Sequence, residues 1–124
     1  MRSLCLILLL ALPQAAGAAD LKVTGRAGYL SEWEVSATAR AAPDGREFAG
    51  PLVMRHTGLC TVDGPVEKAG DIRFRRTGWP LAGLTATIVI EGVSCSFSAR
   101  GSASYDGFMK CPGTPSVPLS LSVE

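Results

Sequence analysis

The sequence has 124 residues, with 12 Lys and Arg, 11 Asp and Glu, one His and four Cys, and a formal net charge of +1. A chain of this length is too short for two ordinary domains. The nearly balanced charge gives no electrostatic reason to bind a polyanion, so we expect no nucleic-acid partner.

Residues 1–19 have the pattern of a secretory signal peptide. Arg2 supplies a positive charge, Leu4–Leu12 is an almost unbroken apolar run, and small residues end the segment. The run is much shorter than the ~20 residues of a membrane-spanning helix. We therefore expect cleavage after Ala19, no transmembrane segment in the remainder, and a single β domain over residues 20–124.

Loss of the signal peptide changes the charge and the cysteine count. Arg2 and Cys5 leave with it, so 11 basic residues face 11 acidic ones and three cysteines remain, namely Cys60, Cys95 and Cys111. The mature part is rich in Ala, Gly, Arg and Pro and contains no Asn, which is typical of a GC-rich genome. Together with the signal peptide, this composition predicts a periplasmic or secreted protein of the bacterial cell envelope.

Most of the mature sequence alternates apolar and polar residues, which is the period of a β-strand. Alternation is found at 21–23, 32–40, 47–57, 71–76, 84–90, 93–99 and 119–123, with a looser segment at 101–111. The segment 57–70 is expected to be rich in loops, and turn signals stand at 43–45, 63–65, 91–92 and 106–107. We predict an all-β fold, a small antiparallel barrel-like meander or a sandwich of seven to eight strands. The short turns favour the meander.

An exported chain of this size is expected to use a disulfide bond for stability. Cys95 and Cys111 flank a possible hairpin and are directly opposed if its centre lies near Ala103. The sequence therefore predicts a Cys95–Cys111 bond, with Cys60–Cys111 as the alternative. The bond should add ~3 kcal/mol for a loop of this length.

His56 is the only side chain that ordinarily titrates near neutral pH, so it is a possible pH-sensitive residue. The simpler interpretation is that His56 ends an inward-facing strand row and hydrogen-bonds the backbone. A catalytic pair with Cys60 is the alternative, and it lacks a residue to orient the ring. One His and one nearby Cys do not make a tetrahedral metal site, so we expect neither a metal nor a cofactor.

The densest positive charge lies at Arg73, Arg75 and Arg76. Guanidinium groups bind carboxylates and phosphates through paired hydrogen bonds, so these residues form a candidate surface for an anion or an acidic partner. The alternative is a solvated outer face. Trp79 and Tyr105 are expected in turns, where they would contact a partner or cover the end of a barrel.

No motif identifies a family, so function is inferred from the class of fold and from the absence of a nucleophile–base–orienter set. We expect a non-enzymatic exported β domain that binds a protein partner, as an inhibitor or as an accessory subunit of an envelope complex. The alternative is a small-molecule or lipid carrier with its ligand inside the barrel. A small hydrolase is the third hypothesis.

Overall fold

The computed structural model describes residues 20–61, 64–78 and 80–124. The predicted signal peptide at 1–19 and Trp79 lie outside the described residues. The strands are β1 (Leu21–Ala27), β2 (Trp33–Ala41), β3 (Glu47–Thr61), β4 (Gly64–Thr77), β5 (Gly83–Ile90), β6 (Val93–Arg100), β7 (Ser104–Lys110) and β8 (Val117–Val123). Within these described ranges, no helix has the length and apolar character needed to cross a membrane.

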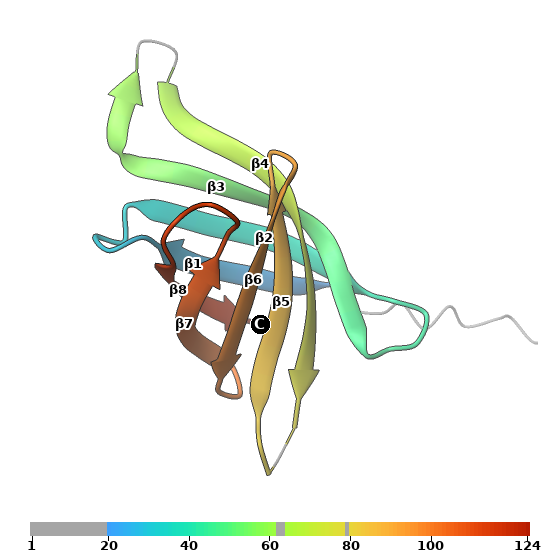
Figure 1. The fold of residues 1–124 in the computed structure, drawn as a ribbon. Coiled ribbons are helices and arrows are strands. Elements are labelled where there is room, and N and C mark those ends of the chain that lie inside the picture. The colour runs from blue at the N-terminus through green and yellow to red at the C-terminus, as the bar shows by residue number, and fades with distance from the viewer. Residues whose placement is uncertain (1–19, 62–63, 79) are drawn as a thin grey trace, which may run out of the picture.

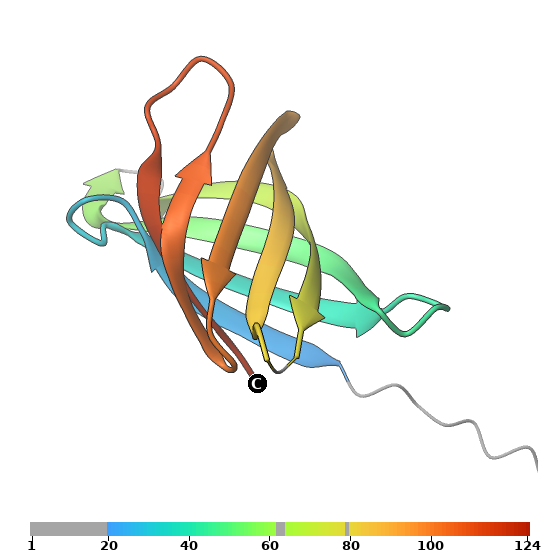
Figure 2. The ribbon, with the colours of Figure 1, turned by 60° about the horizontal axis from the view of Figure 1, so that its bottom comes forward.

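The strands form a closed antiparallel barrel in which each one pairs with its neighbours along the chain. The last strand returns to the first, and Gly25 of β1 lies opposite Leu121 of β8. Figures 1 and 2 show the meander from two directions. The prediction of an all-β meander is confirmed, and closure through β1 and β8 makes it a barrel rather than a sandwich.

Alternation along the strands places one set of side chains inside the barrel. In β5, for example, Leu84, Ala86 and Ile88 are buried while Thr85 and Thr87 between them are exposed. The largest fully buried side chains come from several strands: Tyr105, Phe74, Phe97, Leu52, Ile72, Ile88, Leu119 and Leu121, with Val23 and Val35. These residues fill the interior with apolar groups, and their burial is the main source of stability.

Two inward-facing glycines allow the barrel wall to bend sharply. A Cβ atom at Gly50 would collide with the carbonyl oxygen of Thr38 on β2. A Cβ atom at Gly70 would likewise collide with the carbonyl oxygen of Val89 on β5. Glycine is therefore required at both positions, because neighbouring backbones approach where the long strands β3 and β4 curve.

The β3–β4 hairpin differs from the expectation of a loop over residues 57–70. β3 continues to Thr61 and β4 begins at Gly64, so the hairpin projects beyond the neighbouring strands (Figure 1). Pairing of Arg55 with Glu67 and of Cys60 with Pro65 brackets a register shift. The Gly, Pro and charged residues lower local strand propensity, but strand pairing outweighs it here.

A second expectation, a turn at Asp106–Gly107, is also wrong. Both residues lie within β7, and Gly107 pairs with Leu119. Gly107 faces inward, where a Cβ atom would come within 3.1 Å of the Phe97 ring. The glycine therefore makes room for a core aromatic residue, and the chain turns earlier, between β6 and β7.

The turn predicted at Glu91–Gly92 is confirmed as the two-residue connection between β5 and β6. Glu91 has φ 49° and Gly92 has φ 82°. Positive φ at both central residues is the geometry of tight hairpin turns whose twist matches that of the strands.

The disulfide bond joins Cys95 to Cys111, as the hairpin register predicts, and the alternative Cys60–Cys111 pairing is not formed. Their Cα atoms are 4.3 Å apart. The β6–β7 ladder beside the bond has only three pairs, running from Ser96–Lys110 to Ser98–Phe108. The covalent bond therefore links β6 and β7, two neighbouring strands that share few backbone pairs.

Candidate functional site at the barrel mouth

One end of the barrel carries an apolar hollow of about 490 Å³, which we call the mouth. The connections β1–β2, β5–β6 and β7–β8 surround it, and the β3–β4 hairpin projects from the same end (Figure 1). Its lining comprises Tyr29, Met54, Lys68, Ile90, Glu91, Val93, Cys95, Met109, Cys111, Thr114, Pro115 and Val117. The volume lies in the range of sites that hold small ligands or the side chains of a partner.

The floor of the mouth is lined by flexible methionine side chains, and its rim is apolar. Met54 and Met109 are buried at the floor, and methionine side chains adapt to differently shaped partners. On the β1–β2 connection, Tyr29 is 71% exposed and Leu30 is 88% exposed, while Val93 across the mouth is 44% exposed. Large apolar groups exposed around a concave surface are typical of a binding site.

Hydrogen bonds hold the rim in place. The Tyr29 hydroxyl donates to the carbonyl oxygen of Ser116 at 2.9 Å, which ties the β1–β2 connection to the β7–β8 connection. The backbone N–H of Leu30 donates to the Glu32 carboxylate at 3.0 Å. The disulfide bond fixes one end of the β7–β8 connection. A rim held in this way loses less conformational entropy when a partner binds.

Trp33, His56 and Lys68 lie together where the projecting hairpin leaves the barrel. The rings of Trp33 and His56 meet edge to face with centroids 4.8 Å apart. The Lys68 ammonium lies 5.1 Å from the centroid of the Trp33 ring, a cation–π contact. Lys68 also lines the mouth, so the cluster connects the hairpin to the apolar hollow.

His56 ends the inward-facing row of β3 and accepts a hydrogen bond from the backbone N–H of Gly58 on Nδ1, at 3.1 Å. This is the simpler of the two interpretations that the sequence left open. The side chain of Cys60 lies outside the described part of the chain, so the Cys60–His56 pair stays a hypothesis.

The three arginines of the charged cluster do not share one surface. Arg73 on the outer face forms an ion pair with Glu47, with Nε 3.3 Å from Oε1. Arg76 turns the other way and lies over the Phe48 ring, 5.6 Å from its centroid. Arg75 and Arg76 instead border a different hollow, at the end of the barrel opposite the mouth.

Tyr105 is not at a turn, and this expectation is corrected. The residue lies in β7, is 1% exposed and points into the barrel. Its hydroxyl donates to the carbonyl oxygen of Ser102 at 3.0 Å. Tyr105 is thus part of the core and cannot contact a partner, whereas Trp79 lies outside the described residues.

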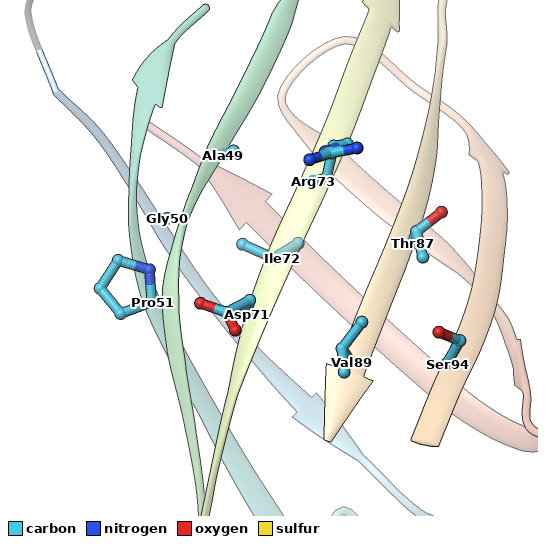
Figure 3. A pocket seen from close by; sticks show the side chains of 9 residues that line it. All are labelled: Ala49, Gly50, Pro51, Asp71, Ile72, Arg73, Thr87, Val89 and Ser94. Carbon is cyan, nitrogen blue, oxygen red and sulfur yellow. The ribbon is translucent and has the colours of Figure 1, made fainter. Parts of the chain in front are cut away.

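A further hollow of about 650 Å³ lies on the outer wall over β3, β4, β5 and β6 (Figure 3). Asp71 and Arg73, both on β4, lie in it with Thr87 and Ser94 (Figure 3). Asp71 pairs across the sheet with Pro51 on one side and Val89 on the other. The hollow alternates polar and apolar groups on regular strands, and we assign it no role.

Sequence reasoning missed the mouth itself. Tyr29, Met54, Val93 and Val117 are far apart in the sequence, and only barrel closure brings them together. A signal in the sequence is Tyr29–Leu30, two large apolar residues that directly follow Gly28, a residue that favours turns. Comparison of the chain with family models, with curated proteins and with solved structures gives no match.

Proposed function

We propose that the chain is an exported, non-enzymatic binding domain that holds an apolar part of a protein partner in its mouth. The single observation that carries this proposal is the apolar rim: Tyr29 and Val93 line the hollow and are exposed, and Leu30 is exposed beside Tyr29 on the β1–β2 connection. Exposed aromatic and aliphatic anchors around a concave centre are the usual energetic core of a protein interface.

The cell envelope is the proposed location. A Cys95–Cys111 disulfide suits an oxidising compartment such as the periplasm or the exterior of a bacterium. The signal-like residues 1–19 support the same location. In the envelope, a small rigid barrel with one apolar end would act as an inhibitor that covers a partner's site or as an accessory subunit.

A capture experiment tests the proposal with matched variants. The mature protein, its Leu30→Ser variant and its Leu81→Ser variant are immobilised and exposed to the envelope fraction of the native organism. Leu81 is the control because it is 70% exposed but lies on the β4–β5 connection, at the other end of the barrel. The proposal predicts a partner retained by the parent and by Leu81→Ser, and lost by Leu30→Ser. Identical capture by all three proteins would refute the mouth as the interface.

A small apolar molecule is the second candidate occupant, because the lining of the mouth is mostly apolar and extends to buried Met109. Phe74, Phe97 and Tyr105 fill the barrel below, so we propose this ligand at the mouth and not deep in the interior. Native mass spectrometry of the purified protein tests this candidate. A bound small molecule that is lost in Met109→Lys but kept in Leu81→Ser would favour a carrier over a protein binder.

A further inference from the structure

The end of the barrel opposite the mouth holds a hollow of about 410 Å³, which we call the arginine hollow. It lies between the β2–β3 connection and the end of β4. Its lining consists of Gly45, Arg46, Phe48, Arg75, Arg76 and Thr77. Three arginines from two separate segments therefore border one concave surface.

These guanidinium groups have no carboxylate partner in the part of the chain that the structure describes. The two ion pairs found there join Arg40 to Asp20 and Arg73 to Glu47. Arg46, Arg75 and Arg76 form none. Unpaired positive charges in a hollow keep their hydrogen-bond donors available for an anion from solution.

Two carboxylates lie nearby, and both have partners of their own. Glu47, opposite Arg75 on the neighbouring strand, forms the ion pair with Arg73, and Asp44 is held by its own loop. Oδ1 of Asp44 accepts the backbone N–H of Arg46 at 2.9 Å and that of Glu47 at 3.3 Å. Its charge acts on Arg75 and Arg46 from beyond ion-pair distance. Since Arg73 offsets the charge of Glu47, the three arginines of the hollow against the Asp44 carboxylate leave a surplus of positive charge close to that needed to balance a dianion.

Arg76 is held in place before any anion binds. Its guanidinium lies over the Phe48 ring, and Phe48 stacks on the buried Phe74 with centroids 5.4 Å apart and planes at 17°. This stack holds the Phe48 ring in place, and with it the surface that the Arg76 guanidinium contacts. A positioned arginine loses less side-chain entropy on binding than a freely moving one.

We propose that the arginine hollow binds a phosphate group. A phosphate carries about −1.5 to −2 charges near pH 7 and offers oxygens in several directions. It can therefore meet guanidinium groups that arrive from the β2–β3 connection and from β4 at once. A carboxylate has two coplanar oxygens, which match a single guanidinium fork. This site is separate from the mouth and does not depend on the function proposed there.

Two sources of phosphate are distinguished by two probes. Inorganic phosphate, titrated by calorimetry and by NMR into the mature protein, tests for a soluble ligand. Sedimentation with vesicles of phosphatidylglycerol, against vesicles of phosphatidylcholine, tests for a lipid headgroup. Binding of either probe that depends on the arginine hollow supports the proposal, and the probe that binds identifies the source.

Variants that change the charge of the arginine hollow measure how far binding of the probe depends on it. Arg75→Gln and Arg76→Gln should each raise the Kd for the bound probe about tenfold, the loss expected for one charge-assisted hydrogen bond. Asp44→Asn should lower the Kd several-fold, because the amide oxygen keeps the loop hydrogen bonds while the opposing charge is removed. Arg40→Gln, which breaks the ion pair with Asp20, is the matched control and should change nothing.

The proposal is overturned if neither probe binds the parent protein. It is also overturned if Arg40→Gln weakens binding as much as Arg75→Gln, because the affinity would then come from general charge. Urea unfolding of each variant establishes that the barrel is intact. Arg75 and Arg76 are both exposed, so their removal should leave stability nearly unchanged.

Discussion

At the scale of single residues, the two tyrosines with assigned hydroxyl contacts illustrate how burial sets the value of a hydrogen bond. Tyr105 is 1% exposed and Tyr29 is 71% exposed, yet each hydroxyl donates to a backbone carbonyl at similar distance. Water can replace the partner of Tyr29, whereas it reaches the part-buried Tyr105 contact less readily. The same bond should therefore contribute more at Tyr105.

Phenylalanine substitutions test this difference. Tyr105→Phe should lower the free energy of unfolding by about 1 kcal/mol, because it leaves the carbonyl oxygen of Ser102 without its donor. Tyr29→Phe should cost less than about 0.5 kcal/mol, as expected for an exposed position. Urea unfolding of both variants measures the difference, and an equal cost would contradict the placement of Tyr105 in the core.

The ionised Asp44 carboxylate stabilises the fold, and this stabilisation is lost at acid pH. The backbone N–H of Arg46 is the main cause that holds the pKa of Asp44 below its ordinary value of 3.8, and Arg75 and Arg46 add to it. A lowered pKa in the folded state means stability that is present above 3.8 and lost as the pH falls through the folded pKa. The parent should therefore be more stable than Asp44→Asn at pH 7.

The test is how the difference in stability between the parent and Asp44→Asn changes with pH. The difference between parent and Asp44→Asn in urea midpoint should be constant near neutral pH and should shrink as the pH falls below 3.8. NMR titration of the Asp44 carboxyl in the folded protein should give a pKa below 3.8. A gap that widens in acid would contradict the assigned contacts of Asp44.

At the scale of elements, the disulfide compensates for a short ladder. β6 and β7 share three paired positions, and the Cys95–Cys111 bond lies directly beside the Ser96–Lys110 pair. The double variant Cys95→Ala, Cys111→Ala should lose about 3 kcal/mol of stability, as expected for a loop with a sequence separation of 16. Urea unfolding with and without reductant provides the check. The reductant should destabilise the parent and leave the double variant unchanged.

The curvature of β4 depends on Gly70, and an alanine there tests it. Gly70→Ala should destabilise the barrel by roughly 1–3 kcal/mol, because the new methyl group meets the carbonyl oxygen of Val89. Gly78, where a Cβ atom would meet nothing within 4 Å, is the control and should tolerate alanine within about 0.5 kcal/mol. Similar thermal unfolding of the two variants would contradict the proposed bend.

Strands with regular alternation could be predicted from the sequence, and strands held mainly by their neighbours could not. β5 carries four alternating apolar residues, and the Glu91–Gly92 turn fixes its pairing with β6. The extensions of β3 and β4 contain Gly, Pro and charged residues that favour loops locally. Their strand structure comes from pairing across the hairpin, which no short sequence window contains.

In the candidate site, too, features set by local sequence could be predicted and features set by distant contacts could not. The Cys95–Cys111 bond could be predicted because both residues belong to one hairpin, whose register fixes which positions are opposed. Arg73, Arg75 and Arg76 are close in sequence, but only Arg75 and Arg76 border one hollow, whereas Arg73 pairs with Glu47 on the outer face. The mouth could not be predicted, since it draws residues from distant connections.

At the scale of the whole molecule, the two ends of the barrel differ in chemistry. The mouth end exposes Tyr29 and Val93 around a hollow with an apolar floor, and Leu30 beside Tyr29. The opposite end gathers Arg46, Arg75 and Arg76. A rigid, filled barrel separates them, so we propose that each end binds its own ligand without a change in the fold.

The central claim is that the mouth is the surface that binds a partner. Hydroxyl-radical footprinting of the protein alone and in its captured complex tests the claim most directly. Binding at the mouth predicts reduced oxidation of Tyr29 and Leu30 in the complex, with Leu81 at the opposite end unchanged. Reduced oxidation of Leu81 with Tyr29 and Leu30 unaffected would contradict it.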